Sequence, residues 1–126
     1  MESPAKARFA LDLVRERKAL APVLFDVSEM TSFTDFFLVA AGGSTRQVQA
    51  ITRHLVRKMR EAGWHARGVE GEQEGQWVLV DYGDLVVHIF FEPVRDFYDL
   101  ESLWVEAPRV EPGPESGEGR SDDAGG

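Results

Sequence analysis

The chain has 126 residues, of which 43% are hydrophobic and 29% are charged, so it can bury one core of ordinary size. Its 22 acidic and 14 basic side chains give a net charge of -8, which argues against binding to duplex DNA or to an anionic membrane. The absence of cysteine excludes disulfides, thiolate metal sites and thiol nucleophiles. Three histidines are too few to favour a transition-metal centre, so we expect neither a metal nor a cofactor.

The N-terminal residues predict no targeting signal. Met1 to Pro4 lack the basic and apolar regions of a signal peptide. The longest apolar run, Phe36 to Ala41, is far shorter than the ~18 residues that a membrane span needs. We therefore expect a cytoplasmic protein that does not enter a membrane.

The composition changes sharply at Pro108. Residues 108–126 contain five Gly, three Pro and five acidic residues, with Val110 as the single branched aliphatic residue. Such a segment cannot offset its ordering entropy by burial. We therefore expect one folded domain over residues 1–107 and a disordered acidic tail over residues 108–126. The tail accounts for -3 of the net charge of -8, so the domain itself carries -5.

The first part of the chain predicts one helix and two strands. Apolar residues at helical spacing predict a helix over residues 3–19, which Pro22 closes. A short strand over residues 23–27 and a polar connection over residues 28–34, with room for one helical turn, come next. Phe36 to Ala41 is a continuous apolar run before two glycines, which predicts a central strand covered on both faces.

The second part begins with a helix and continues mainly as strands. Ser44 to Gln47 has the form of a capping box, and an apolar stripe follows until Gly63, in the position after the C-cap. The remaining predicted elements are a strand near residues 66–69, a linker over 70–76, strands over 77–82 and 85–91, and a helix over about 94–103. This alternation predicts an α/β fold with one mixed sheet.

Gly83 and Asp84 predict a two-residue hairpin loop of type II′, which fixes how the last two strands pair. The predicted pairs are Asp81 with Val86, Val80 with Val87, Leu79 with His88, Val78 with Ile89, and Trp77 with Phe90. Because strand side chains alternate, this register assigns each residue of the hairpin to one of two faces.

The two predicted faces of the hairpin differ in chemistry. The face that we expect to meet the helices is apolar and contains Val78, Val80, Tyr82, Leu85, Val87, Ile89 and Phe91. The opposite face, which we call the hairpin face, contains Trp77, Leu79, Asp81, Val86, His88 and Phe90. Aromatic residues interleaved with a carboxylate and an imidazole are typical of a protein contact surface. The alternative is that another helix covers this face and that His88 is a hydrogen-bonded core histidine.

Catalytic motifs are weak in this chain. Gly42, Gly43 and Ser44 lie between a strand and a helix, where backbone amides can hold a phosphate with help from Arg46. Nucleotidyltransferases of the polymerase-beta type begin similarly, but need paired acids about ten residues later to hold magnesium. Residues 53–57 contain no acid, so a structural cap is the better interpretation.

Three other polar groupings favour structural roles. Asp81 and Asp84 flank the hairpin turn and are better explained as turn formers than as a metal pair. Ser44 and His88 lack the sequence context of a nucleophile elbow, so we predict no catalytic residue. Arg95 and the acids around it predict a solvated helical face.

The order of the motifs resembles that of the ribosomal silencing factor (Iojap-like) family. The matching segments are residues 24–28, 32–37, 42–48, 77–84, 87–90 and 95–104. Most specific are Trp-x-Leu-x-Asp-Tyr-Gly-Asp at residues 77–84 and Phe-Tyr-Asp-Leu-Glu-x-Leu-Trp at residues 97–104. The resemblance extends from about residue 23 to residue 104.

The resemblance implies an α/β domain shaped like a nucleotidyltransferase without its catalytic acids, and therefore a protein that is not an enzyme. It implies binding to the large ribosomal subunit through ribosomal protein L-fourteen, which hinders joining of the small subunit and represses translation when nutrients are short. The acidic domain suits a basic ribosomal protein better than rRNA. We expect the contact at Trp77, Leu79, Asp81, His88 and Phe90, with Tyr98 as a further candidate.

Two other functional classes remain open from the sequence. A nucleotide-binding or nucleotidyltransferase-type enzyme would use the loop from Gly42 to Ser44. A self-associating scaffold would use the hairpin face to form a homodimer, and such a dimer would mask the same face from a ribosomal partner.

Overall fold

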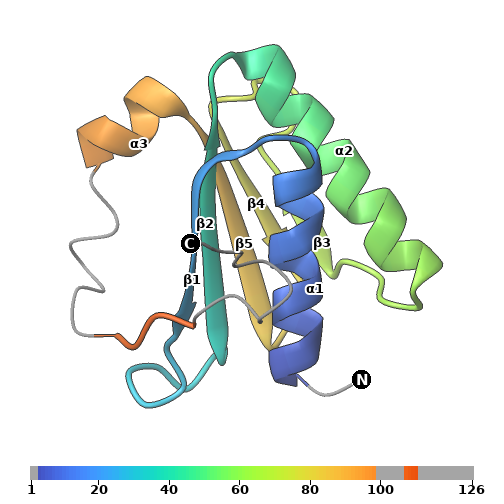
Figure 1. Cartoon of the computed structure of the whole chain (residues 1–126), viewed down its shortest axis with the longest axis vertical. Helices are drawn as coiled ribbons and strands as arrows, with labels where there is room; N and C mark the ends of the chain where they lie inside the picture. The colour runs from blue at the N-terminus through green and yellow to red at the C-terminus, as the bar shows by residue number, and fades with distance from the viewer. Residues whose placement is uncertain (1–2, 99–106, 111–126) are drawn as a thin grey trace, which may run out of the picture.

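Helices alternate with runs of two or three strands along the chain (Figure 1). The structure is a computed structural model that describes residues 3–98 and 107–110. Its elements are α1 (Ser3–Glu16), β1 (Leu20–Asp26), β2 (Phe36–Gly42), α2 (Thr45–Glu61), β3 (Gly68–Glu70), β4 (Trp77–Asp81), β5 (Leu85–Phe91) and α3 (Glu92–Tyr98). Within the described residues, no helix combines the length and the apolar character that crossing a bilayer requires.

The strands form one mixed sheet in the order β1-β2-β5-β4-β3. β2 and β5 run parallel, whereas the other neighbouring strands are antiparallel. This confirms the predicted α/β domain with a mixed sheet. β2 is buried along its whole length, as predicted, but β5 occupies the central position. A parallel pair needs a long crossover, and the segment from α2 to β4 supplies it, so β5 enters the sheet between β2 and β4.

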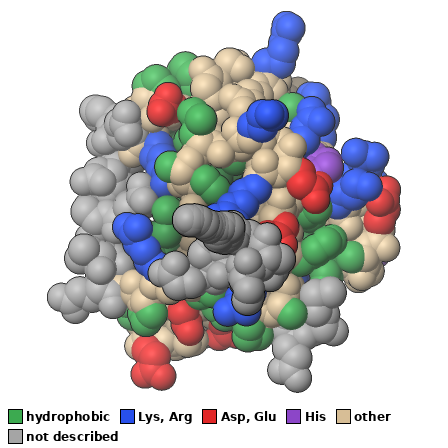
Figure 2. Space-filling view, viewed as in Figure 1, with side chains coloured by type: hydrophobic (Ala, Val, Ile, Leu, Met, Phe, Trp, Pro, Cys, Tyr) green, Lys and Arg blue, Asp and Glu red, His purple; other side chains and the backbone are tan. Residues whose placement is uncertain are grey.

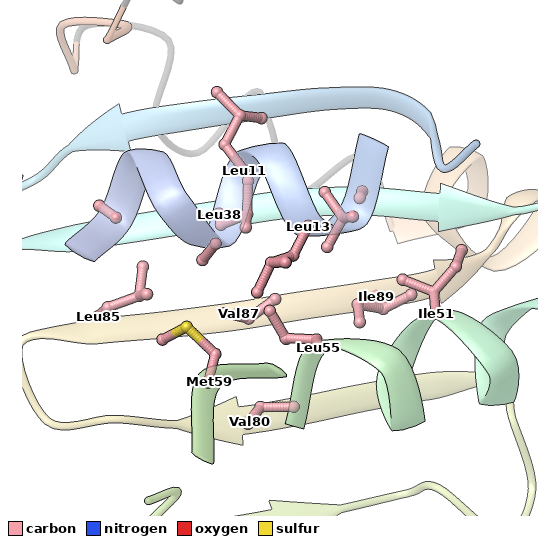
Figure 3. Packing of buried hydrophobic residues seen from close by; sticks show 14 of the residues in the cluster. Leu11, Leu13, Leu38, Ile51, Leu55, Met59, Val80, Leu85, Val87 and Ile89 are labelled. Carbon is pink, nitrogen blue, oxygen red and sulfur yellow. The ribbon is translucent and has the colours of Figure 1, made fainter. Parts of the chain in front are cut away.

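α1 and α2 lie side by side on one face of the sheet (Figure 1). Their apolar side chains recur at helical spacing and meet every second residue of the strands. Figure 3 shows this layer, which includes Leu11 and Leu13 of α1, Ile51, Leu55 and Met59 of α2, Leu38 of β2, Val80 of β4, and Leu85, Val87 and Ile89 of β5. The predicted apolar face of the hairpin therefore belongs to the main core.

The loop between β2 and α2 caps the helix. Ser44 Oγ accepts a hydrogen bond from the backbone N–H of Gln47 at 3.0 Å, which is the predicted N-cap bond. Gln47 Oε1 accepts a 2.6 Å bond from the N–H of Gly43, one residue earlier than in a capping box. A Cβ atom at Gly42 would lie 2.9 Å from the backbone nitrogen of Val48, so glycine permits this close approach of strand and helix.

The connection from α1 to β1 departs from the prediction. α1 ends at Glu16 and not near Ala19, because Lys18 adopts a φ of 58° that a helix cannot contain. Pro22 lies inside β1 and does not precede the strand. β1 is at the edge of the sheet, and its pairing with β2 is irregular between Leu20 and Val23, so Pro22 fits there without breaking the ladder.

α3 and Ala107 cover part of the second face of the sheet. Val94 and Ala107 pack on a smaller core that contains Phe25 and Phe90. Arg95, predicted on a solvated face, is instead buried and donates from Nη1 to the carbonyl oxygen of Leu20 at 3.1 Å. It therefore ties α3 to the irregular start of β1, which sequence periodicity does not reveal.

The residues after the predicted domain boundary pair with β1. The carbonyl oxygen of Pro108 accepts a hydrogen bond from the N–H of Asp26, and the N–H of Val110 donates to the carbonyl oxygen of Leu24, both at 2.8 Å. Residues 108–110 thus contact the domain although they lie in the predicted tail, because backbone pairing needs no apolar composition; the predicted boundary itself stays a prediction. Residues 111–126, and the part of the last predicted helix beyond Tyr98, lie outside the described residues.

Replacing Ser44 with Ala should lower the free energy of unfolding by about 1 kcal/mol, because the N–H of Gln47 loses its cap. Chemical denaturation of the wild type and the variant measures the difference. Ser32→Ala, at an exposed loop position, is the matched control and should change stability little. Equal stability of Ser44→Ala and the wild type would contradict a capping role.

Two truncations test whether residues 108–110 stabilise the domain. A chain that ends at Val110 should unfold like the full chain, whereas one that ends at Ala107 should lose about 2 kcal/mol with its two backbone bonds to β1. For a domain of this size, we expect Tm to fall by about 8 °C. Thermal unfolding of both chains checks this, and identical transitions would show that residues 108–110 add nothing to the fold.

Candidate functional site

The hairpin of β4 and β5 has the predicted register. The observed pairs are Trp77 with Phe90, Val78 with Ile89, Leu79 with His88, Val80 with Val87, and Asp81 with Val86. The backbone N–H of Tyr82 donates to the carbonyl oxygen of Leu85 at 2.8 Å, and Gly83 has the positive φ of 87° that the first position of a type II′ loop requires. The two faces of the hairpin therefore contain the predicted residues.

The hairpin face is divided into a covered part and an open part. Phe90 is fully buried and His88 is 9% exposed, so neither is the exposed contact residue that was expected. Trp77 is 37% exposed, and Leu79 and Asp81 are half-buried. The covering elements reach the β5 side of this face and leave β4 accessible. The β5 side therefore fits the interpretation of a covered face, and the β4 side fits the interpretation of a contact surface. The side chain of Tyr98 lies outside the described residues.

Trp77 is held rigidly on this face. Its ring centroid lies 5.0 Å from that of Phe90, and its Nε1 donates to His88 Nδ1 at 3.2 Å. The imidazole ring is in turn stacked on Phe90 at 6.1 Å. His88 and Phe90 therefore support the exposed indole from below and fix its orientation.

Aromatic rings continue from Trp77 across the sheet. Phe37 of β2 contacts His88 edge-on at 5.2 Å, and Phe33 contacts Phe37 at 6.2 Å. Phe33 is 68% exposed, so the row has an accessible ring at each end. Neither Phe33 nor Phe37 was among the predicted site residues; the alternation of β2 side chains could have placed Phe37 on this face, but Phe33 lies in a loop without periodicity.

A shallow hollow of about 360 Å³ adjoins Trp77. Glu70, Gly71, Trp77 and Leu79 line it, and we call these four residues the Trp77 patch. Glu70 pairs with Leu79 across β3 and β4 and places an exposed carboxylate beside the apolar residues. This arrangement of a rigid aromatic ring, an apolar floor and an acidic rim suits a basic protein partner.

Asp81 and Asp84 serve the hairpin turn. Asp81 Oδ1 accepts a 2.7 Å bond from the N–H of Gly83, and Asp84 forms a 2.8 Å ion pair with Lys6 of α1. Both carboxylates thus have structural partners, which favours the predicted turn-forming role. Among the described residues, no group of three or more His, Cys, Asp or Glu side chains is placed to hold a metal.

The loop from Gly42 to Ser44 is occupied by its own helix cap. Gln47 accepts from the N–H of Gly43 through its side-chain oxygen and donates its own backbone N–H to the hydroxyl of Ser44. Its Nε2 donates to the carbonyl oxygen of Lys18 at 3.2 Å. These groups are the ones that a phosphate would need, so the geometry favours the cap over a nucleotide site. Ser44 begins a helix on one side of the sheet whereas His88 lies on the other, so the two cannot act as a catalytic pair.

Acidification should destabilise the fold through His88. Burial lowers the pKa of His88 from 6.5 to about 4, so between these values the unfolded chain binds a proton that the folded chain does not. The stability that neutral His88 provides is complete above pH 6.5 and is lost as the pH falls toward 4. At pH 4.5 the loss should be about 2 to 3 kcal/mol.

Denaturation of the wild type and of His88→Asn at pH 7 and pH 4.5 measures this effect. Asparagine retains an acceptor for Trp77 but does not titrate, so the wild type should lose more stability than the variant on acidification. Carboxylates elsewhere contribute equally to both proteins and cancel in the comparison. The same loss in both proteins would show that His88 does not titrate as described.

Comparison with known proteins identifies the family. A family model described as "Ribosomal silencing factor during starvation" matches residues 1–125. The chain is 38% identical over 111 residues to "Ribosomal silencing factor RsfS" of Halalkalibacterium halodurans, an alignment that covers 88% of this chain and 95% of that protein. It is 30% identical over 105 residues to "Mitochondrial assembly of ribosomal large subunit protein 1" of Mus musculus, covering 78% of this chain and 46% of that protein.

A solved structure agrees with these sequence matches. The crystal structure of a Chromobacterium violaceum protein superposes with a TM-score of 0.81 at 36% identity, and covers 94% of this chain and 98% of that one. By sequence and by fold, the chain belongs to the ribosomal silencing factor family.

Proposed function

We propose that this protein binds the large ribosomal subunit through ribosomal protein L-fourteen and thereby blocks joining of the small subunit. The observation that carries the proposal is the rigid, partly exposed indole of Trp77, held by Phe90 and His88 beside Leu79. Buried aromatic anchors in well-packed surroundings dominate the binding energy of protein interfaces. The family name and the large-subunit name of the mouse relative support a ribosomal partner.

The charge of this surface supports a basic protein as the partner. Glu70 is exposed at the rim of the Trp77 patch, and Asp81 lies at the end of the same strand as Trp77. Complementary charges at a rim steer association and fix the orientation of the complex, while the apolar centre supplies affinity. A ribosomal protein that presents lysine or arginine side chains around an apolar pocket would match this arrangement.

Blocking would need no catalytic group. A domain of about 110 residues has a radius of gyration of about 13 Å, and a body of that size on the joining face would occupy space that the small subunit needs. The described residues offer no assembled catalytic group, and the Gly42 to Ser44 loop is used as a cap. The protein would therefore act by occupancy, and its effect would follow its binding affinity.

Three single variants of the Trp77 patch should weaken binding to isolated L-fourteen. Trp77→Ala removes the anchor and should cost about thirty-fold in affinity, which corresponds to about 2 kcal/mol. Leu79→Lys should weaken binding similarly and leaves the bond from Trp77 to His88 intact. Glu70→Lys should mainly slow association, because it reverses a rim charge. Titration calorimetry and stopped-flow association measure these effects, after thermal unfolding shows that each variant folds.

The matched control is Glu61→Lys, which makes the same charge change at an exposed position at the end of α2, on the other side of the sheet. It should bind L-fourteen like the wild type. Asp81→Lys is a poorer test, because it also removes the bond to Gly83 in the hairpin turn. If folded Trp77→Ala and Leu79→Lys proteins bind L-fourteen and block subunit joining at wild-type concentrations, the assignment of this surface is wrong.

A further inference from the structure

The outer face of α2 carries a row of arginines. Arg46, Arg53, Arg57 and Arg60 are separated by seven, four and three residues, which places them along one face of the helix. We call these four residues the arginine stripe. All four side chains are exposed, and the stripe extends about 21 Å along the helix axis.

The arginine stripe continues onto the residues just after α1, Arg17 and Lys18. One surface hollow is lined by Arg53, Arg57, Arg60, Val56, Val69 and Glu72, and a second shares Arg53 and Arg57 with it and adds Arg17, Ala50 and His54. A third hollow shares Arg17 and Ala50 with the second and adds Glu16, Lys18 and Gln47. The three hollows therefore form one continuous basic surface. Figure 2 shows Lys and Arg side chains gathered over α2 on the right of the view.

The two acids of this surface already have partners. Glu16 contacts His54 at 2.8 Å, and Glu72 contacts Arg53 at 3.4 Å. Arg17, Lys18, Arg57 and Arg60 form no ion pair with any residue that the structure describes. A chain with a net charge of -8 thus concentrates uncompensated positive charge on one helical face.

The chemistry of the basic surface favours a polyanion over a protein. Its hollows are lined by Ala50, Val56 and Val69 as their only apolar residues, so it lacks the aromatic centre that protein interfaces favour. Nucleic-acid interfaces are instead strongly positive and polar. Arginine forks match phosphate oxygens in pairs, and several along one helix can follow a phosphate backbone.

We propose that the arginine stripe, with Arg17 and Lys18, binds the phosphate backbone of structured RNA. This proposal rests on the proposed function, since the large subunit would offer RNA beside its proteins. The basic surface and the Trp77 patch meet at the edge strand β3, where Val69 lines the basic hollow and the next residue, Glu70, lines the acidic one. One partner made of a basic protein and RNA can therefore contact both surfaces around this edge.

The experiment uses the full chain and a fluorescently labelled RNA duplex of about 20 base pairs with mixed sequence. Anisotropy at 50 to 200 mM KCl should show binding that weakens by about a hundred-fold over this range, as expected for four or five phosphate contacts. The double variant Arg57→Ala with Arg60→Ala should bind more weakly and reduce the slope of log affinity against log salt by about two. Arg57→Lys with Arg60→Lys keeps the charge and should keep the slope.

The matched control is Arg8→Ala with Arg67→Ala, which removes two exposed arginines that line none of the three hollows. It should bind the duplex with the salt slope of the wild type. Absence of duplex binding by the wild type, or equal binding by the Arg57 and Arg60 alanine variant, would overturn the proposal. Duplex binding that appears only after residues 111–126 are removed would also overturn it. In that case the acidic segment, and not RNA, would occupy the basic surface in the full chain.

A second comparison separates this inference from the proposed function. The Arg57 and Arg60 alanine variant should bind isolated L-fourteen normally but bind large subunits at least about tenfold more weakly. Trp77→Ala should show the opposite pattern: it should bind the isolated duplex normally and isolated L-fourteen weakly. If the wild type binds the duplex but not L-fourteen, the proposed function is wrong. If it binds L-fourteen but not the duplex, this inference is wrong.

Discussion

The parallel pairing of β2 with β5 is the constraint on which the rest of the fold depends. Both strands are almost entirely buried, so each must be covered on two faces. α1 and α2 cover one face with a large apolar layer. On the other face, Val94 of α3 and Ala107, both later in the chain than the whole sheet, pack on a smaller core. This second cover stops short of β4, and the candidate docking surface exists because of that limit.

The surface around Trp77 combines exposure with rigidity. An exposed indole on a flexible chain would lose conformational entropy on binding, and this loss would reduce affinity. Here Phe90 lies beneath the ring and His88 accepts its N–H, so the orientation is fixed before a partner arrives. In the proposed site, His88 and Phe90 would act mainly through Trp77, because Phe90 is fully buried and His88 is nearly so. The same burial keeps His88 neutral, as its acceptor role requires.

Charge in this protein is organised by surface and not by the chain average. The net charge of -8 argues against a nucleic-acid partner, yet α2 presents four arginines along one face and the loop after α1 adds two more cations. The Trp77 patch, with its exposed Glu70, and the basic helical surface lie on opposite sides of the sheet and adjoin at β3 and the two residues after it, Gly71 and Glu72. A local field acts over about one Debye length, about 8 Å at physiological salt, so the two surfaces would attract partners of opposite charge.

The sequence by itself determined the hairpin register and its two faces, because a two-residue loop and the period of two leave no other pairing for Trp77 to Phe91. It also determined the cap of α2 at Ser44, since capping is a local interaction. Only the tertiary structure decided which part of the hairpin face is open. Burial of Phe90, His88 and Arg95 depends on segments distant in sequence, and no local pattern records which of them come together.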